Sequence, residues 1–136
     1  MPQISRNKLS TKAQKDLINN VVTILNSISR KEEMEVFLTT FLTETEVLML
    51  AKRLAIIILV SEGFNDSEIA STLHMTRITV AKTRYYYEGR GQEGLTIALT
   101  KIAKDKRLQE MKGALLALTR YSIRAAGGYV TPKIFD

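Results

Sequence analysis

The chain has 136 residues, of which 45% are hydrophobic, so it can bury a real core and its length indicates one domain spanning residues 1–136. With no cysteine and a single histidine, it excludes a disulfide framework and a cysteine-ligated metal, and we expect no metal site. A formal net charge of +6 and a pI near 9.7 favour a polyanionic partner.

Proline occurs only at positions 2 and 132, and the apolar residues recur at helical spacing, which predicts an all-α fold. A first helix is expected after Ser10, with its apolar face formed by Leu17, Ile18, Val21, Val22, Leu25 and Ile28. A second, short helix is expected over residues 31–40. We interpret residues 1–41 as N-terminal dimerisation helices, residues 42–90 as a core helix with a DNA-binding unit, and residues 91–136 as a C-terminal helical extension.

A long helix is predicted to begin at Thr43 and to end near Gly63, because Thr43 with Glu46 three residues later forms a capping box. The second half of this helix is apolar on every side, so it must be covered all round. Either a second subunit or the C-terminal segment can close over it, and this need for packing favours a dimer. The apolar run at 54–60 is far shorter than the roughly 20 residues that cross a bilayer.

Residues 66–84 have the pattern of two short helices joined by a tight turn. Asp66 and Thr76 are the expected N-caps of these helices. The apolar contacts between the helices are expected from Ile69, Leu73, Met75 and Val80, with the small residue Ala70 where the helices approach closely. His74 falls in the turn, where the backbone often has a positive φ, and we interpret it as a turn residue without a metal or catalytic role.

The second helix of this pair, predicted over Thr76 to Glu88, has the chemistry of a DNA-reading helix. Val80, Thr83 and Tyr87 share the side that should face the protein. Arg77 can pair with guanine, and acidic residues are absent until Glu88. Lys82 and Arg84 are expected to hold phosphates. The predicted DNA contacts are Thr76, Arg77, Ile78, Thr79, Ala81, Lys82, Arg84 and Tyr85.

The segment from Gly89 to Gly94 should break the helix and start another. Downstream, a helix-packing seam is expected from Leu108, Met111, Leu115, Leu118, Ser122 and Ala125. Gly127 and Gly128 should end it, and the apolar residues of the tail can dock on the body or on a partner. From residue 95 to the end there are eight basic and three acidic residues, which form either a second polyanion-binding surface or a solvated basic face.

Residues 41–84, FLTETEVLMLAKRLAIIILVSEGFNDSEIASTLHMTRITVAKTR, resemble the central part of the Trp repressor superfamily, and look closest to its Trp-repressor-like (YerC/YecD-type) branch. The resemblance covers about a third of the chain. It implies an all-α, intertwined homodimer whose two reading helices enter successive major grooves, acting as a transcriptional regulator or repressor.

The resemblance also points to a ligand pocket at Leu42, Thr43, Arg53 and Lys82, the positions that match the co-repressor site of the Trp repressor. There the ligand's indole ring lies between two arginines, but Lys82 replaces one of them here, and Thr83 replaces a glycine. A lysine cannot stack on indole as a planar guanidinium does, and threonine narrows the space. We therefore expect no cofactor and disfavour tryptophan as a co-repressor.

Three functions remain as hypotheses. The leading one is a dimeric, sequence-specific regulator that binds double-stranded DNA. We expect it to act in the cytoplasm, because the N-terminus lacks the apolar core of a signal peptide. The alternative is a protein- or RNA-interaction module in which the helix-turn-helix is structural. An enzyme is disfavoured, since the sequence shows no nucleophile with its base, no metal cluster and no phosphate-cradling loop.

Overall fold

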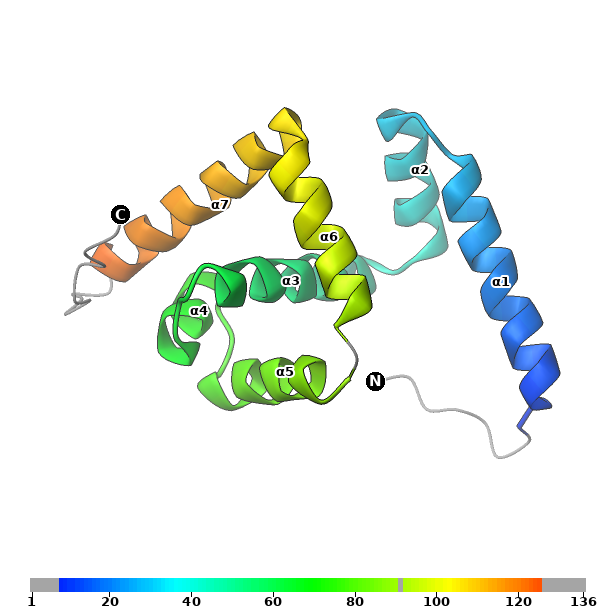
Figure 1. Cartoon of the computed structure of the whole chain (residues 1–136), viewed down its shortest axis with the longest axis horizontal. Coiled ribbons are helices and arrows are strands. Elements are labelled where there is room, and N and C mark those ends of the chain that lie inside the picture. The colour runs from blue at the N-terminus through cyan, green and yellow to red at the C-terminus, as the bar shows by residue number, and fades with distance from the viewer. Residues whose placement is uncertain (1–7, 91, 126–136) are drawn as a thin grey trace. The chain divides into compact units, whose positions relative to one another are not determined.

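The computed structural model describes residues 8–90 and 92–125, and within these ranges every element of regular secondary structure is a helix, which confirms the all-α prediction. The helices are α1 (Thr11–Ser27), α2 (Lys31–Phe41), α3 (Glu44–Ser61), α4 (Asp66–Leu73), α5 (Arg77–Gly89), α6 (Glu93–Lys104) and α7 (Lys106–Ala125), as Figure 1 shows. The chain divides into two compact units, residues 1–47 and 48–136. The single domain expected from the length stays a prediction.

The first unit contains the helices α1 and α2 and the start of α3. The Ser10 hydroxyl accepts a hydrogen bond from the Ala13 backbone N–H at 3.1 Å, so α1 begins where the sequence predicts. The capping box of α3 is also confirmed: the Thr43 hydroxyl accepts from the Glu46 N–H at 3.1 Å, and the Glu46 carboxylate accepts from the Thr43 N–H at 2.9 Å. Neither α1 nor α2 has a buried residue.

The second unit begins inside α3, and the end of that helix is shaped by Gly63. Its φ of 85° lies in the left-handed region, which glycine adopts without steric cost. The N–H of Gly63 donates to the Val60 carbonyl at 3.0 Å, and the N–H of Phe64 donates to the Leu59 carbonyl at 3.1 Å. This is the hydrogen-bond pattern of a Schellman motif, so the helix end close to Gly63 is confirmed.

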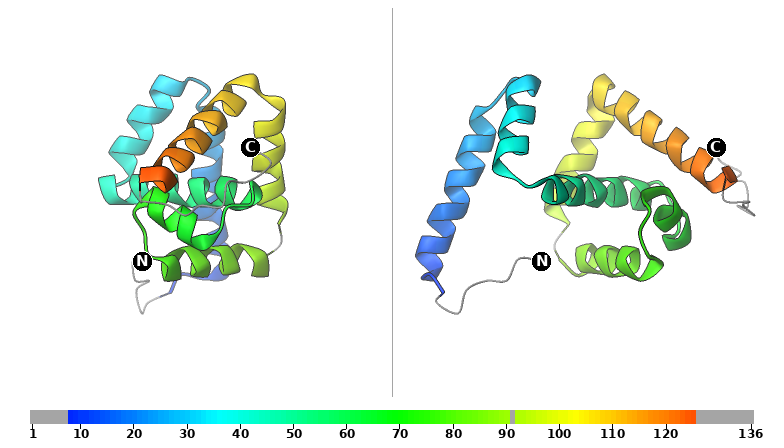
Figure 2. Two further views of the ribbon diagram at one scale, coloured as in Figure 1. Left: turned by 90° about the vertical axis from the view of Figure 1, so that its left-hand side faces the viewer. Right: turned by 180° about the vertical axis from the view of Figure 1, so that it is seen from behind.

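The core of the second unit lies around the end of α3. Its buried members come from α3, α4, α5 and α7 and the turn after α3: Ile56, Leu59, Phe64, Ile69, Ala70, Val80 and Ile123. Helix α7 packs against α4 and α6, and its Leu115 and Leu116 lie against this cluster. Figure 2 shows α6 and α7 meeting at a corner, from which α7 runs back to α4. The sequence predicts that either a second subunit or the C-terminal segment packs on the apolar half of α3. In the structure, α7 of the C-terminal segment does so.

The predicted seam of α7 is only partly right. Leu108, Leu115 and Ser122 are half-buried, but Met111, Leu118 and Ala125 are exposed. The buried positions of α7 are Thr119 and Ile123. Thr119 can be buried because its hydroxyl donates to the Leu115 carbonyl at 2.8 Å, and a pattern of apolar residues alone misses such a position. The glycines and apolar residues predicted to end the helix and form the tail lie outside the described residues.

A candidate nucleic-acid interface

Helices α4 and α5 pack against each other as the two arms of a helix-turn-helix. The first arm begins one residue earlier than the sequence predicts, because its N-cap is Asn65 and not Asp66. The Asn65 side chain accepts from the Glu68 N–H at 2.8 Å, and the Glu68 carboxylate accepts from the Asn65 N–H at 2.9 Å. Asn65 is the N-cap because, of the two residues, only Asn65 has a glutamate three positions later, which completes a capping box. Asp66 is thus the first helical residue, and its carboxylate is free to act elsewhere.

The turn between the helices is held by His74, whose φ of 54° and ψ of 51° are left-handed, as predicted for this position. The N–H of the next residue, Met75, donates to the Ala70 carbonyl at 3.0 Å, which closes the end of α4. The His74 side chain is exposed. The residue therefore serves the turn by its backbone conformation.

The predicted contacts between the two arms are confirmed. Ile69 and Val80 are fully buried, and Ala70 is 6% exposed, so the helices meet through these side chains. Leu73 and Met75 are half-buried against the same cluster. Thr83 and Tyr87, which share a side of α5 with Val80, are also half-buried. This packing fixes which side of α5 faces the protein and leaves the other side to solvent.

The N-terminal end of α5 projects polar and charged groups outward. Thr76 is the N-cap, as predicted, since its hydroxyl accepts from the Thr79 N–H at 3.1 Å. The two threonine hydroxyls are also hydrogen-bonded to each other at 2.8 Å. Thr76, Arg77, Ile78 and Thr79 are all exposed. A guanidinium at the N-terminus of an exposed helix is well placed to reach base edges.

The outer side of α5 continues with Ile78, Lys82 and Tyr85. Ile78 is 68% exposed and Tyr85 is 78% exposed, so both side chains are accessible to a partner. Ala81 is half-buried, while Lys82 is exposed. Arg77 and Lys82 form no ion pair with any described residue, so their charges are available to an external anion.

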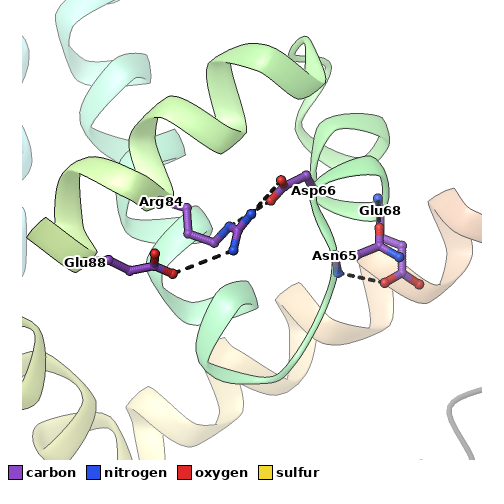
Figure 3. A network of polar contacts seen from close by, with 5 residues as sticks. All are labelled: Asn65, Asp66, Glu68, Arg84 and Glu88. Carbon is purple, nitrogen blue, oxygen red and sulfur yellow. Dashed lines mark hydrogen bonds and ion pairs between the residues drawn. The ribbon is translucent and has the colours of Figure 1, made fainter.

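Arg84 differs from these two cations, because carboxylates surround it (Figure 3). Its Nε donates to Asp66 Oδ1 at 3.0 Å, and its Nη2 donates to Asp66 Oδ2 at 2.8 Å. Its Nη1 lies 3.6 Å from a carboxylate oxygen of Glu88. The hydrogen bonds to Asp66, followed by the attraction of its charge, raise the pKa of Arg84 above its ordinary value.

The four residues of the ligand pocket that the resemblance implies are not gathered in one unit. Leu42 and Thr43 lie in the first unit, Arg53 and Lys82 in the second, and the pocket stays a prediction. A cavity of about 210 Å³ lies within the second unit between α3, α5 and α6, and none of those four residues lines it. The described residues contain no group of three or more metal-ligating side chains that could hold an ion.

The comparisons with known proteins agree with this geometry. Residues 50–96, from α3 through α4 and α5 to the start of α6, match a family model described as a homeodomain-like domain. The chain carries a helix-turn-helix domain. At this coarse level the match indicates a DNA-binding protein, whereas the Trp-repressor-like type stays a prediction. No curated protein and no solved structure matches the chain.

The sequence alone does not indicate which basic side chains form ion pairs with carboxylates of the same chain. Asp66 and Arg84 are 18 residues apart, so no local spacing predicts their pairing. Lys112 of α7 forms an ion pair with Glu62, just after α3, which also removes one basic group from the C-terminal surface. Among the described helices, none is both long and apolar enough to cross a membrane.

Proposed function

We propose that this protein is a homodimeric, sequence-specific DNA-binding regulator of the Trp-repressor-like type, and that α5 enters the major groove. The observation that carries the proposal is the outer side of α5. It combines Arg77 and Lys82, two cations without an ion pair among the described residues, with the exposed side chains Ile78 and Tyr85, on a helix anchored by the buried Val80. Exposed apolar and cationic groups on one helix fit base edges and phosphates together.

The contacts divide by chemistry. Arg77 would pair with guanine O6 and N7, and Ile78 would contact a thymine methyl group. Lys82 would hold a phosphate, which adds affinity and salt dependence without selecting a sequence. The Thr76 hydroxyl accepts from the Thr79 N–H and also shares a hydrogen bond with the Thr79 hydroxyl, so one of the two hydroxyls would donate to a phosphate oxygen while it accepts from the other. Tyr85 is exposed enough to reach either the sugar–phosphate backbone or a base.

The proposed dimer is supported by the N-terminal helices. The exposed large apolar residues of α1 and α2 are Leu17, Ile18, Val21, Val22, Ile24, Val36 and Phe41. Exposed apolar surface of this extent on two adjoining helices is typical of a subunit interface. Light scattering should therefore give twice the mass of one chain, and Val22→Glu should shift the protein toward the monomer.

We further propose that the protein is not an enzyme and needs no cofactor. The direct test of sequence-specific DNA binding is selection from random DNA duplexes with the purified protein, read by sequencing. We expect enrichment of a site with two half-sites about one helical turn apart, since each reading helix of a dimer occupies one major groove. Recovery without any enrichment would contradict the proposal.

A second candidate, a protein- or RNA-interaction module, is favoured by one observation. Lys101, Lys104, Lys106 and Arg107 are all exposed around the corner between α6 and α7. If this surface carried the function, the protein would bind duplex DNA, RNA and other polyanions with equal, weak affinity. Exchange of Lys101 and Lys104 for glutamine would then abolish binding, whereas the first proposal predicts that sequence discrimination survives it.

A further inference from the structure

The sequence predicts Arg84 as a phosphate contact, yet its environment in the structure argues against that role. Each of its three guanidinium nitrogens faces a carboxylate oxygen, two from Asp66 and one from Glu88. The Arg84 side chain is 40% exposed, and that of Asp66 is 20% exposed. Asp66 accepts the Nε–H and one Nη2–H of Arg84, and the Glu88 carboxylate lies beside Nη1, so a phosphate would approach a guanidinium whose charge two carboxylates already offset.

The charge balance leads to the same conclusion. Asp66, Arg84 and Glu88 together carry a net charge of −1, so this part of α5 does not add positive potential toward a DNA backbone. The cations without a described partner, Arg77 and Lys82, lie nearer the N-terminal end of the helix. The positive potential of the reading surface therefore comes from those two residues.

The ion pair connects two rigid points of the helix-turn-helix (Figure 3). Asp66 is the first residue of α4, directly after the capping box of Asn65 and Glu68, so its backbone is held by hydrogen bonds. Arg84 lies one turn beyond Val80, the buried anchor of α5. Val80 fixes α5 against the core at one point, and the bidentate pair fixes it at a second. The directional ion pair adds to the packing of Val80, Thr83 and Tyr87, and so further restricts the rotation and tilt of the helix.

We propose that Arg84 is a positioning residue of the DNA-reading helix, acting through Asp66, and that it is not a phosphate contact. This inference rests on the proposed function and replaces the role in phosphate binding predicted for Arg84 from sequence. A planar, bidentate pair fixes an angle as well as a distance, so it can orient Arg77 and Ile78 toward base edges. Specificity, more than affinity for DNA in general, should depend on it.

The test compares Arg84→Gln, Asp66→Asn and the double variant, which removes the pair without changing the net charge. The control is Lys82→Gln, which removes an exposed cation from the same helix. Binding to the selected site and to a random duplex is measured by fluorescence anisotropy over a range of salt concentrations. A lost phosphate contact lowers the slope of log K against log [salt] by about 0.9.

If Arg84 positions α5, Arg84→Gln and Asp66→Asn each lower the ratio of specific to non-specific affinity by about tenfold, and the double variant loses no more than either alone. The salt slope stays that of the wild type in the double variant but falls in Lys82→Gln. Arg84→Lys should behave like Arg84→Gln, because lysine can serve a phosphate but cannot form the bidentate pair.

Two results would overturn the inference. One is a fall of about 0.9 in the salt slope of the double variant, with Arg84→Lys restoring binding. The other is a gain of affinity for every duplex in Asp66→Asn, as expected if the mutation frees Arg84 for phosphate.

A wild-type protein without sequence preference would instead contradict the proposed function. In that case amide hydrogen exchange of α5 decides the inference: equal acceleration in both single variants, not increased in the double variant, supports the pair as an orienting contact. Unchanged exchange in all three variants refutes it.

Discussion

Two apolar residues of α5 should have different roles, Val80 in the stability of the fold and Ile78 in the contact with DNA. The variants Val80→Ala and Ile78→Ala distinguish these roles. Val80 is fully buried, so its truncation removes two methyl groups from the core, worth about 0.8 kcal/mol each. The cavity left between α4 and α5 adds to this, for a total loss of about 2–3 kcal/mol in the free energy of unfolding. Ile78 is 68% exposed, and its truncation should change that free energy by less than about 0.5 kcal/mol.

The assays are urea unfolding followed by circular dichroism, and binding of the folded variants to the selected duplex. Ile78→Ala should keep the unfolding midpoint of the wild type but lower affinity for a site with thymine at the contacted position by about 1 kcal/mol. Replacing that thymine by deoxyuridine, which lacks the methyl group, should cost the wild type a similar amount and cost Ile78→Ala nothing. If Ile78→Ala destabilised the protein as much as Val80→Ala does, the orientation assigned to α5 would be wrong.

Three further predictions concern the local structure around the reading helix. His74→Gly should raise the free energy of unfolding by about 0.5–1 kcal/mol, because the left-handed conformation costs a non-glycine residue about 1–2 kcal/mol. Part of this gain is lost because glycine increases the conformational entropy of the unfolded chain. A lower melting temperature of the variant would contradict this prediction. Asn65→Ala should cost about 1 kcal/mol in chemical unfolding by removing the cap of α4, and an effect below about 0.3 kcal/mol would show that Asn65 is not the cap. Hydrogen bonds from the backbone and then the hydroxyl of Thr43 lower the pKa of Glu46 below its ordinary value of 4.5. Their stabilising effect is therefore present above pH 4.5 and lost as the pH falls through the lower folded value of the pKa. An NMR titration should show the midpoint of Glu46 rising in Thr43→Ala. It should not rise in the control Thr39→Ala, which removes an exposed threonine hydroxyl of α2 that bonds only its own helix.

Most of the local structure could be predicted from sequence because it depends on interactions between residues three or four positions apart. The caps at Ser10, Thr43 and Thr76 are of this kind, since each side chain bonds a backbone N–H three residues later. The left-handed turn at His74 and the buried side of α5 also follow from local pattern and helical period.

The features that could not be predicted depend on tertiary contacts, or on a choice between two adjacent residues that are both suitable caps. Asn65 and Asp66 are both good caps, and the choice between them depended on Glu68. Once Asp66 is inside α4, its carboxylate can reach Arg84 of α5, a partner that periodicity does not indicate. Thr119 was missed because its burial depends on a hydrogen bond to its own helix.

If the outer side of α5 reads DNA bases, Arg77 discriminates between sequences and Lys82 does not. Affinities of wild type, Arg77→Ala and Lys82→Ala are determined for the selected site and for every single-base variant of it. Arg77→Ala should lower affinity for the preferred site by about 1–3 kcal/mol and remove discrimination at one position, whereas Lys82→Ala should weaken all sequences alike. If both variants bound every duplex as the wild type does, α5 would not be the reading helix.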